Sequence, residues 1–161
     1  MRRVIVFAAL AALCACVSPD ANVSEQGTAL SGLALAQNAR VRECPPERTQ
    51  AGARSEGFGA TSGVTVEDVA VTALAGDPAR ALRLRRIVVQ PGGVIAWHDH
   101  AAVQGMALLA TGEMVELRNT CLDPIAYRAG DIAREDAETA HSWRNESDSV
   151  AVVLVSHVVA R

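Results

Sequence analysis

The alternation of hydrophobic and polar positions from residue 63 onward predicts β-strands. Residues 64–74 are rich in β-branched side chains and alternate in part. Residues 80–90 alternate leucines, Leu82 and Leu84, with arginines, a pattern typical of a half-buried strand. These two segments predict neighbouring strands joined by a turn that contains glycine and proline.

Later segments continue the same pattern. Glycines and proline at residues 91–93 predict a turn, and Thr111-Gly112 predicts a hairpin between the segments 104–110 and 113–118. A long apolar strand is predicted over residues 149–160. About eight to ten short strands, with no convincing long helix, indicate an all-β sandwich or small barrel.

Composition limits the partners of this domain. Half of the residues are hydrophobic but only 3% are aromatic, so the core must be built from Val, Leu, Ile and Ala. The net charge is -3 and no block of basic residues occurs. We therefore expect neither nucleic acid binding nor attachment to a membrane by charge alone.

The N-terminal residues predict export. Residues 1–17 combine a positive start with an apolar stretch that is too short to span a bilayer, as in a signal peptide. Residues 13–16 are similar to a lipoprotein signal box, so Cys16 is the candidate for lipidation; cleavage before Gln37 is the alternative. We expect an exported protein of the periplasm or cell envelope that meets a membrane only through this lipid anchor. Residues 18–62 are interpreted as a tether and N-terminal arm, and residues 63–161 as the folded barrel.

Two further cysteines remain after such processing. Cys44 and Cys121 would both lie in an oxidising compartment, where disulfides persist. They are candidates for a bridge that joins the arm to the barrel. The alternative is two separate thiols.

Three of the four histidines lie in two short segments. His98 and His100 are two residues apart, so on an extended strand both imidazoles project from the same face. An imidazole from the distant His141 would complete three nitrogen ligands of the kind that divalent transition metals bind. The alternative is exposed or hydrogen-bonded histidines at a strand end.

These residues resemble the first of the two motifs of the cupin superfamily. That motif is glycine, five residues, His-x-His, three or four residues, glutamate, and a glycine after about six more. The sequence has Gly92, His98, His100, Gln104 and Gly112 in this order. Gln104 stands at the glutamate position, and Gly112 falls one residue later than usual.

The second cupin motif is glycine, five residues, Pro-x-Gly, two residues, histidine, three residues and asparagine. Gly130, His141 and Asn145 keep this spacing, whereas Asp136 and Glu138 replace the proline and the second glycine. The resemblance covers about residues 63–160. It implies one cupin barrel, which is a double-stranded β-helix of jelly-roll type.

The resemblance also implies a ligand set. By position, His98, His100 and His141 would bind one divalent transition metal (Fe, Mn, Ni or Zn). Gln104 would be a weak fourth ligand, because its carbonyl oxygen is neutral. The alternative is a cupin whose histidines line a pocket without metal.

Other polar and aromatic residues near the motifs have two interpretations each. Glu135 could be a pocket carboxylate that acts as a catalytic general base or as a hydrogen-bond partner of a ligand histidine, or it could be part of a solvated turn. Trp143 would share the cavity face with His141 and form a wall of a ligand pocket. We interpret His157, alone on the last predicted strand, as a structural histidine rather than a ligand.

Three functions are compatible with this sequence, one of them a structural envelope protein whose barrel serves dimerisation through its outer sheet face. The main hypothesis is an exported metalloenzyme, similar to dioxygenase-type cupins, that acts on a small oxygen-rich substrate. The main alternative is a non-catalytic cupin that binds a small molecule or sugar in the cell envelope. The resemblance also implies a homodimer.

Overall fold

The computed structural model describes residues 40–161. The predicted signal peptide, Cys16 and the first part of the predicted tether lie outside these residues. Lipidation and export therefore stay predictions. Within residues 40–161, no helix is both long and apolar enough to cross a membrane.

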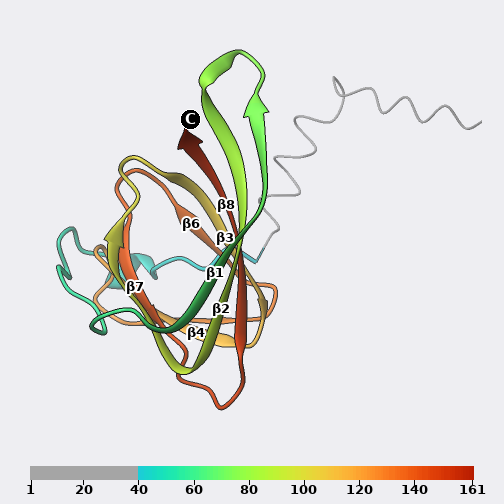
Figure 1. Ribbon diagram of the computed structural model, residues 1–161. Helices are drawn as coiled ribbons and strands as arrows, with labels where there is room; N and C mark the ends of the chain where they lie inside the picture. The colour runs from blue at the N-terminus through green and yellow to red at the C-terminus, as the bar shows by residue number, and fades with distance from the viewer. Residues whose placement is uncertain (1–39) are drawn as a thin grey trace, which may run out of the picture. The chain divides into compact units, whose positions relative to one another are not determined.

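The described chain is built almost entirely of antiparallel strands (Figure 1). Seven of them pair in the order β5-β4-β7-β2-β8-β3-β6, and β1 pairs with β2. Together they form a nearly closed barrel, so the prediction of an all-β fold is confirmed. The strands are β1 (Ser62–Leu74), β2 (Asp77–Asp99), β3 (Gln104–Thr111), β4 (Glu113–Arg118), β5 (Ile125–Arg128), β6 (Ile132–Glu135), β7 (Ala140–Arg144) and β8 (Ala151–Ala160).

Strand β2 passes from one side of the barrel to the other without ending. Its first part pairs with β1 and β8, and its last part pairs with β7. The predicted turn at residues 91–93 is instead a bend within this strand. Gly92 has a φ of +73°, and a Cβ on Gly93 would lie 2.8 Å from the Val89 side chain. The ladder continues past the bend because Gly92 donates to the Asn145 carbonyl and Asn145 donates to the Gly93 carbonyl.

The expected hairpin at Thr111-Gly112 is wrong. Strand β3 pairs with β6 and β8, whereas β4 pairs with β5 and β7. The chain therefore crosses between the two halves of the barrel at Gly112. A side chain is excluded there, since a Cβ on Gly112 would lie 2.8 Å from the Ala151 Cα.

The alternation along β2 is observed, with the arginines on the inner side. Arg83 and Arg85 line the barrel cavity, whereas Leu82 and Leu84 are 37% and 36% exposed. Asp68 on β1 compensates the inward charge, because its carboxylate lies 2.8 Å from Arg85 Nε and 3.7 Å from Arg83 Nε. The inner face of this strand is therefore charged where it meets the cavity.

Aliphatic residues supply most of the core, as the composition predicts. Val89, Leu109, Val153 and Val155 are buried together with small alanines. Four larger side chains complete the cluster: Met114, Ile125, Tyr127 and Trp143. Two of these aromatic side chains lie beside the histidines, because the Trp143 ring is 5.6 Å from the His141 ring and 4.6 Å from the Tyr127 ring.

The arm before β1 is fixed to the barrel. Cys44 and Cys121 form a disulfide with a sequence separation of 77. Arg48 binds Asp123 through two hydrogen bonds, and Arg54 donates to the carbonyls of residues 121 and 122. A short 3-10 helix, η1 (Pro46–Arg48), lies within this arm.

Removing the disulfide is expected to lower the free energy of unfolding by about 2–4 kcal/mol, because a long closed loop limits the unfolded chain. Cys44→Ser/Cys121→Ser would be compared with the oxidised wild type by urea denaturation. The exposed Ser55→Ala change, in the same arm, is the control and should leave stability unchanged. Equal stabilities for the double variant and the wild type would contradict this prediction.

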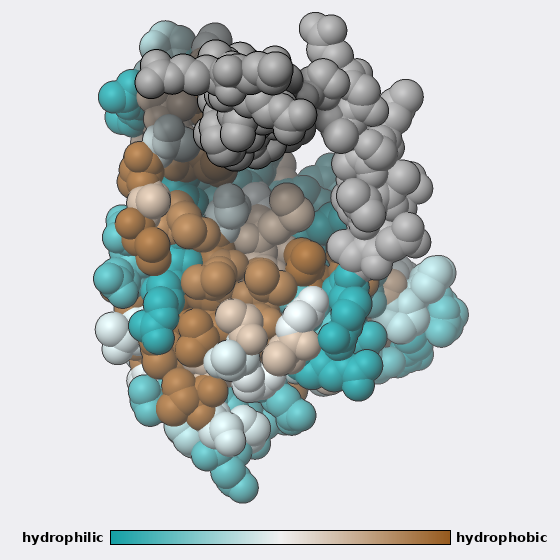
Figure 2. Space-filling view, turned by 90° about the vertical axis from the view of Figure 1, so that its right-hand side faces the viewer, coloured by the Kyte–Doolittle hydropathy of each residue, from teal (hydrophilic) through white to brown (hydrophobic). Residues whose placement is uncertain are grey.

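Several large apolar side chains remain exposed in the described residues, most of them on β1 and β2. Figure 2 shows apolar residues gathered across the middle of one face of the molecule. The predicted homodimer stays a prediction, since the structure contains a single chain. The exposed residues are Val66, Val69, Val71, Leu82, Leu84, Met106, Leu122 and Val150.

Candidate metal centre

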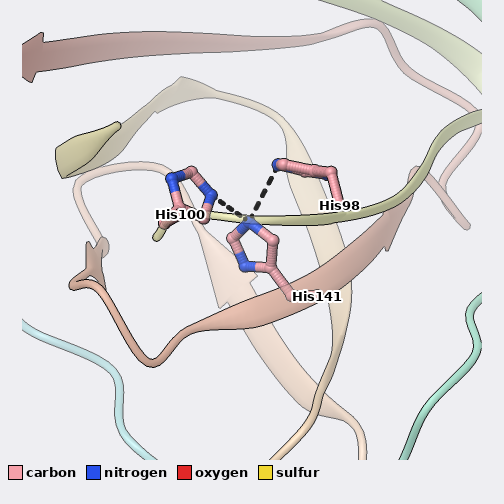
Figure 3. Close-up of side chains that lie close together, drawn as sticks. All are labelled: His98, His100 and His141. Carbon is pink, nitrogen blue, oxygen red and sulfur yellow. Dashed lines mark hydrogen bonds between the residues drawn. The ribbon is translucent and has the colours of Figure 1, made fainter. Parts of the chain in front are cut away.

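Three imidazoles meet inside the barrel (Figure 3). The Nε2 atom of His141 lies 2.9 Å from Nε2 of His100 and 3.2 Å from Nε2 of His98. His100 and His141 are buried, and His98 is partly exposed at the edge of the cavity. The structure therefore brings together all three histidines that the two motifs single out.

The strand pairing creates this arrangement. His98 lies near the end of β2, directly opposite His141 on β7, and His100 follows the last residue of β2. Opposite residues of an antiparallel pair have neighbouring side chains on one face. Because His100 is two residues after His98, its imidazole lies on the same side of the chain as that of His98.

Each imidazole is held in one tautomer by an acceptor at its other nitrogen. His98 Nδ1 donates to the Ala96 carbonyl at 2.9 Å, and His100 Nδ1 donates to the Val103 carbonyl at 2.9 Å. His141 Nδ1 donates to the Glu116 carboxylate at 2.6 Å. Since the acceptors take the Nδ1 protons, the three Nε2 lone pairs are left facing one another.

This donor set fits a divalent transition metal. Two nitrogen ligands about 2.1 Å from one ion and at right angles to each other are about 3.0 Å apart. The observed separations of 2.9 and 3.2 Å match that spacing. Neutral imidazoles with hydrogen-bonded Nδ1 atoms are typical metal ligands, and three of them leave further coordination positions for other molecules.

Sequence reasoning missed the carboxylate behind His141. Glu116 on β4 is fully buried and also accepts from Arg118 Nε at 2.9 Å and from the Tyr127 hydroxyl at 2.7 Å. Burial raises the pKa of Glu116, but the hydrogen bond from His141 and the charge of Arg118 outweigh it and hold the pKa below 4.5. Glu116 is therefore an ionised acceptor that orients His141.

A second buried carboxylate faces the imidazoles. Glu135, the last residue of β6, accepts from His157 Nε2 at 2.6 Å through Oε2. Its Oε1 lies 3.7 Å from His141 Nε2 and 3.9 Å from His100 Nε2. Of the interpretations of Glu135, the solvated turn is wrong, since this side chain is only 4% exposed. His157, interpreted from the sequence as a structural histidine, is a hydrogen-bond partner of this carboxylate.

The structure does not bring Gln104 into the cavity. Gln104 is the exposed first residue of β3, and it does not line the cavity bordered by His98, His100 and Glu135. The cavity has a volume of about 440 Å³. Trp143 forms part of its wall, with the indole ring 5.6 Å from the His141 ring.

Burial of the histidines predicts a pH-dependent stability for the metal-free protein. Burial is the largest cause that lowers the pKa values of His98 and His100 below 6.5. The unfolded chain therefore binds more protons than the folded chain as the pH falls below about 6.5. The stabilisation present above that pH is lost progressively on acidification.

Urea denaturation between pH 7.5 and 5, with a chelator present, measures this loss. We expect the free energy of unfolding to decrease steadily below pH 6.5. His98→Gln should make the free energy of unfolding depend less steeply on pH. A stability that stays constant or rises over this interval would contradict the assignment of neutral, buried imidazoles.

Comparison with known proteins supports the same class of barrel. Residues 85–157 match the family model Cupin_2, described as "Cupin domain". This match covers both histidine segments, and it supports a cupin-2 barrel. The predicted cupin fold is confirmed by the match together with the antiparallel barrel. No curated protein matches the chain.

Solved structures with similar folds share little sequence with this chain. The cupin domain of Cnp3 from Schizosaccharomyces pombe is 8% identical, with 61% of this chain and 66% of that chain covered and a TM-score of 0.48. A cupin 2 conserved barrel domain protein from Salinispora arenicola is 16% identical, with 58% of this chain and 74% of that chain covered and a TM-score of 0.48. A "predicted oxalate decarboxylase" from Thermotoga maritima is 15% identical, with 64% of this chain and 100% of that chain covered and a TM-score of 0.43.

Proposed function

We propose that this barrel binds one divalent transition metal through Nε2 of His98, His100 and His141 and presents it to a small oxygen-rich molecule. One observation carries the proposal. All three Nδ1 atoms are hydrogen-bonded to oxygen acceptors, so three lone pairs converge within the barrel. Lone pairs at this separation repel one another, and a cation placed between them would relieve that repulsion.

The cavity beside the histidines suits a small organic ligand. Its walls include apolar side chains such as Val64, Ile87 and Val153, and its polar groups gather at the histidines and at Arg83. When bound, the metal would polarise a substrate oxygen and hold it close to a second reactant. This chemistry corresponds to a dioxygenase-type reaction on an oxygen-rich substrate.

The protein's own residues would orient the ligand imidazoles and exclude water from the cavity. Glu116 fixes the His141 ring, and Trp143 closes the wall next to it. The disulfide between Cys44 and Cys121 supports a location in an oxidising compartment such as the periplasm or cell envelope.

Elemental analysis tests the metal site. Purified full-length protein would be loaded separately with Mn, Fe, Ni and Zn, desalted and measured for metal content. We expect about one equivalent of at least one of these metals, as for a single structural or catalytic site. Protein that stays metal-free under all four conditions would refute the proposal.

A second candidate function is non-catalytic binding of a small polar molecule. Two buried nitrogen atoms of cavity-lining residues, Arg83 Nε and His157 Nδ1, have no hydrogen-bond partner in residues 40–161. A polar ligand could satisfy such groups. In this case, small polyols, sugars or carboxylates would raise the melting temperature of the metal-free protein. Stabilisation that requires metal would favour the first candidate instead.

A further inference from the structure

The carboxylate beside the imidazoles comes from an unexpected strand. The motif position holds the neutral Gln104, whose side chain is exposed at the start of β3. Glu135 occupies the end of β6, which pairs with β3, and its direct partner there is Gly105. The carboxyl group is therefore supplied one strand away from the motif position.

Gly105 leaves the space through which this carboxylate reaches its partner. Gly105 pairs with Glu135 on one side and with His157 of β8 on the other. A Cβ at Gly105 would lie 2.7 Å from His157 Cδ2 and 1.9 Å from the Ser156 carbonyl oxygen. With no side chain between them, Glu135 and His157 meet across the middle strand at 2.6 Å.

The two oxygens of Glu135 have different surroundings. Oε2 accepts the hydrogen bond from His157 Nε2, whereas Oε1 faces the Nε2 atoms of His100 and His141 at 3.9 and 3.7 Å. These nitrogens present lone pairs, so they cannot donate to Oε1. A buried carboxylate oxygen directed at imidazole lone pairs is placed to share a cation with them.

We propose that Glu135 is the carboxylate ligand of this metal centre and that His157 is its positioning residue. This inference rests on the proposed metal site and completes it with a ligand from outside both motifs. The Oε1 separations exceed the spacing of about 3.0 Å expected for adjacent ligands. An inward shift of the Glu135 carboxylate by about 1 Å would bring Oε1 to that spacing.

The assignment also explains the charge balance of the site. Three neutral imidazoles leave both charges of a divalent ion uncompensated inside the barrel. An ionised Glu135 supplies one negative charge at the ion, and the hydrogen bond from His157 keeps the second oxygen satisfied. A role for Glu135 as a ligand therefore replaces its predicted role as a general base.

Metal titration of full-length variants with an intact disulfide tests the ligand. Co²⁺ and Zn²⁺ dissociation constants would be measured by chelator competition, together with the visible absorption spectrum of the Co²⁺ form. For Glu135→Gln, we expect an affinity at least about 100-fold lower and an altered Co²⁺ spectrum, since loss of an outer partner alone costs 10–100-fold. Gln104→Ala is the matched control and should bind both metals within about twofold of the wild type, because an exposed side chain contributes nothing to the site.

Glu135→Asp covers the case in which the glutamine variant does not fold. It keeps the charge and shortens the side chain by one bond of about 1.5 Å. We expect its circular dichroism to match the wild type while its affinity falls at least about tenfold, since the shorter carboxylate no longer reaches the ion.

His157 is tested by restoring its donor. His157→Leu removes the hydrogen bond to Glu135 and should weaken metal binding by about 10–100-fold. His157→Gln offers an N–H donor again and should recover most of that loss. A merely structural role would affect melting temperature without this pattern of rescue.

The outcomes separate this inference from the metal site itself. If the wild type binds no metal, both proposals are refuted. If the wild type binds metal and His98→Ala does not, the three-histidine site stands. In that case, unchanged affinity and Co²⁺ spectrum in folded Glu135→Gln would refute the ligand role alone, as would a loss of affinity in Gln104→Ala.

Discussion

Replacing His98 by alanine is expected to lower the affinity for a divalent transition metal by at least about 100-fold, which is about 2.7 kcal/mol. His98 is the best of the three histidines for this test because it is partly exposed and, apart from its contact with His141, its ring bonds only to the Ala96 carbonyl. The variant should therefore fold. Two imidazoles remain in place, but one of the three converging lone pairs is lost.

Chelator competition with Zn²⁺ measures this effect. Asp99→Ala is the matched control, because Asp99 is the exposed neighbour of His98 on the same strand and its side chain accepts only from the Ala101 backbone N–H. The control should bind metal almost as the wild type does. Equal affinities for His98→Ala and the wild type would show that this imidazole is not a ligand.

Replacing Glu116 by glutamine is expected to lower the free energy of unfolding by about 3–5 kcal/mol, because Arg118 loses its buried counter-charge. Glu116 accepts hydrogen bonds from His141, Arg118 and the Tyr127 hydroxyl. Glutamine keeps one oxygen and adds two donors, so these three donors can no longer all be accepted. The change should also weaken metal binding by about 10–100-fold, since His141 loses its orienting carboxylate.

Urea denaturation and metal titration of the same preparation separate the two effects. Glu113→Gln is the control, since Glu113 is exposed on the same strand. It should leave stability within about 0.5 kcal/mol of the wild type. The pKa of Glu116 is held below 4.5, so its stabilisation is present at neutral pH and is lost as the pH falls below that value. A Glu116→Gln protein as stable as the wild type would contradict the role given to this network.

The sequence predicts the histidine site well because its spacing has direct geometric consequences. Two residues along a strand return to the same face, so His98 and His100 follow from the two-residue period alone. The meeting with His141 follows from the resemblance to the cupin motifs. No local pattern specifies which distant strand pairs with the end of β2.

The carboxylates are harder to predict. Glu116 and Arg118 share one face of a strand, but alternation does not say that this face is the buried one. Glu135 lies in an acidic run that also predicts a solvated turn, and its contact with His157 depends on the pairing of three strands around Gly105. Such contacts arise from tertiary packing and have no local signal.

The sequence also does not indicate which face of β2 points into the cavity. Alternating leucines and arginines predict the strand, but the cavity takes Arg83 and Arg85 while Leu82 and Leu84 point outward. Asp68, on the neighbouring strand, compensates the arginines and makes this orientation stable. A sequence pattern shows that side chains alternate along a strand, whereas the neighbouring strands determine which of its two faces lines the inside of the barrel.

Anomalous diffraction from crystals of the zinc-loaded protein tests the central proposal most directly. We expect one strong peak about 2.0–2.1 Å from Nε2 of each of His98, His100 and His141, the normal zinc–imidazole distance. A peak elsewhere, or crystals in which the three rings enclose no ion after loading, would contradict the proposed metal centre.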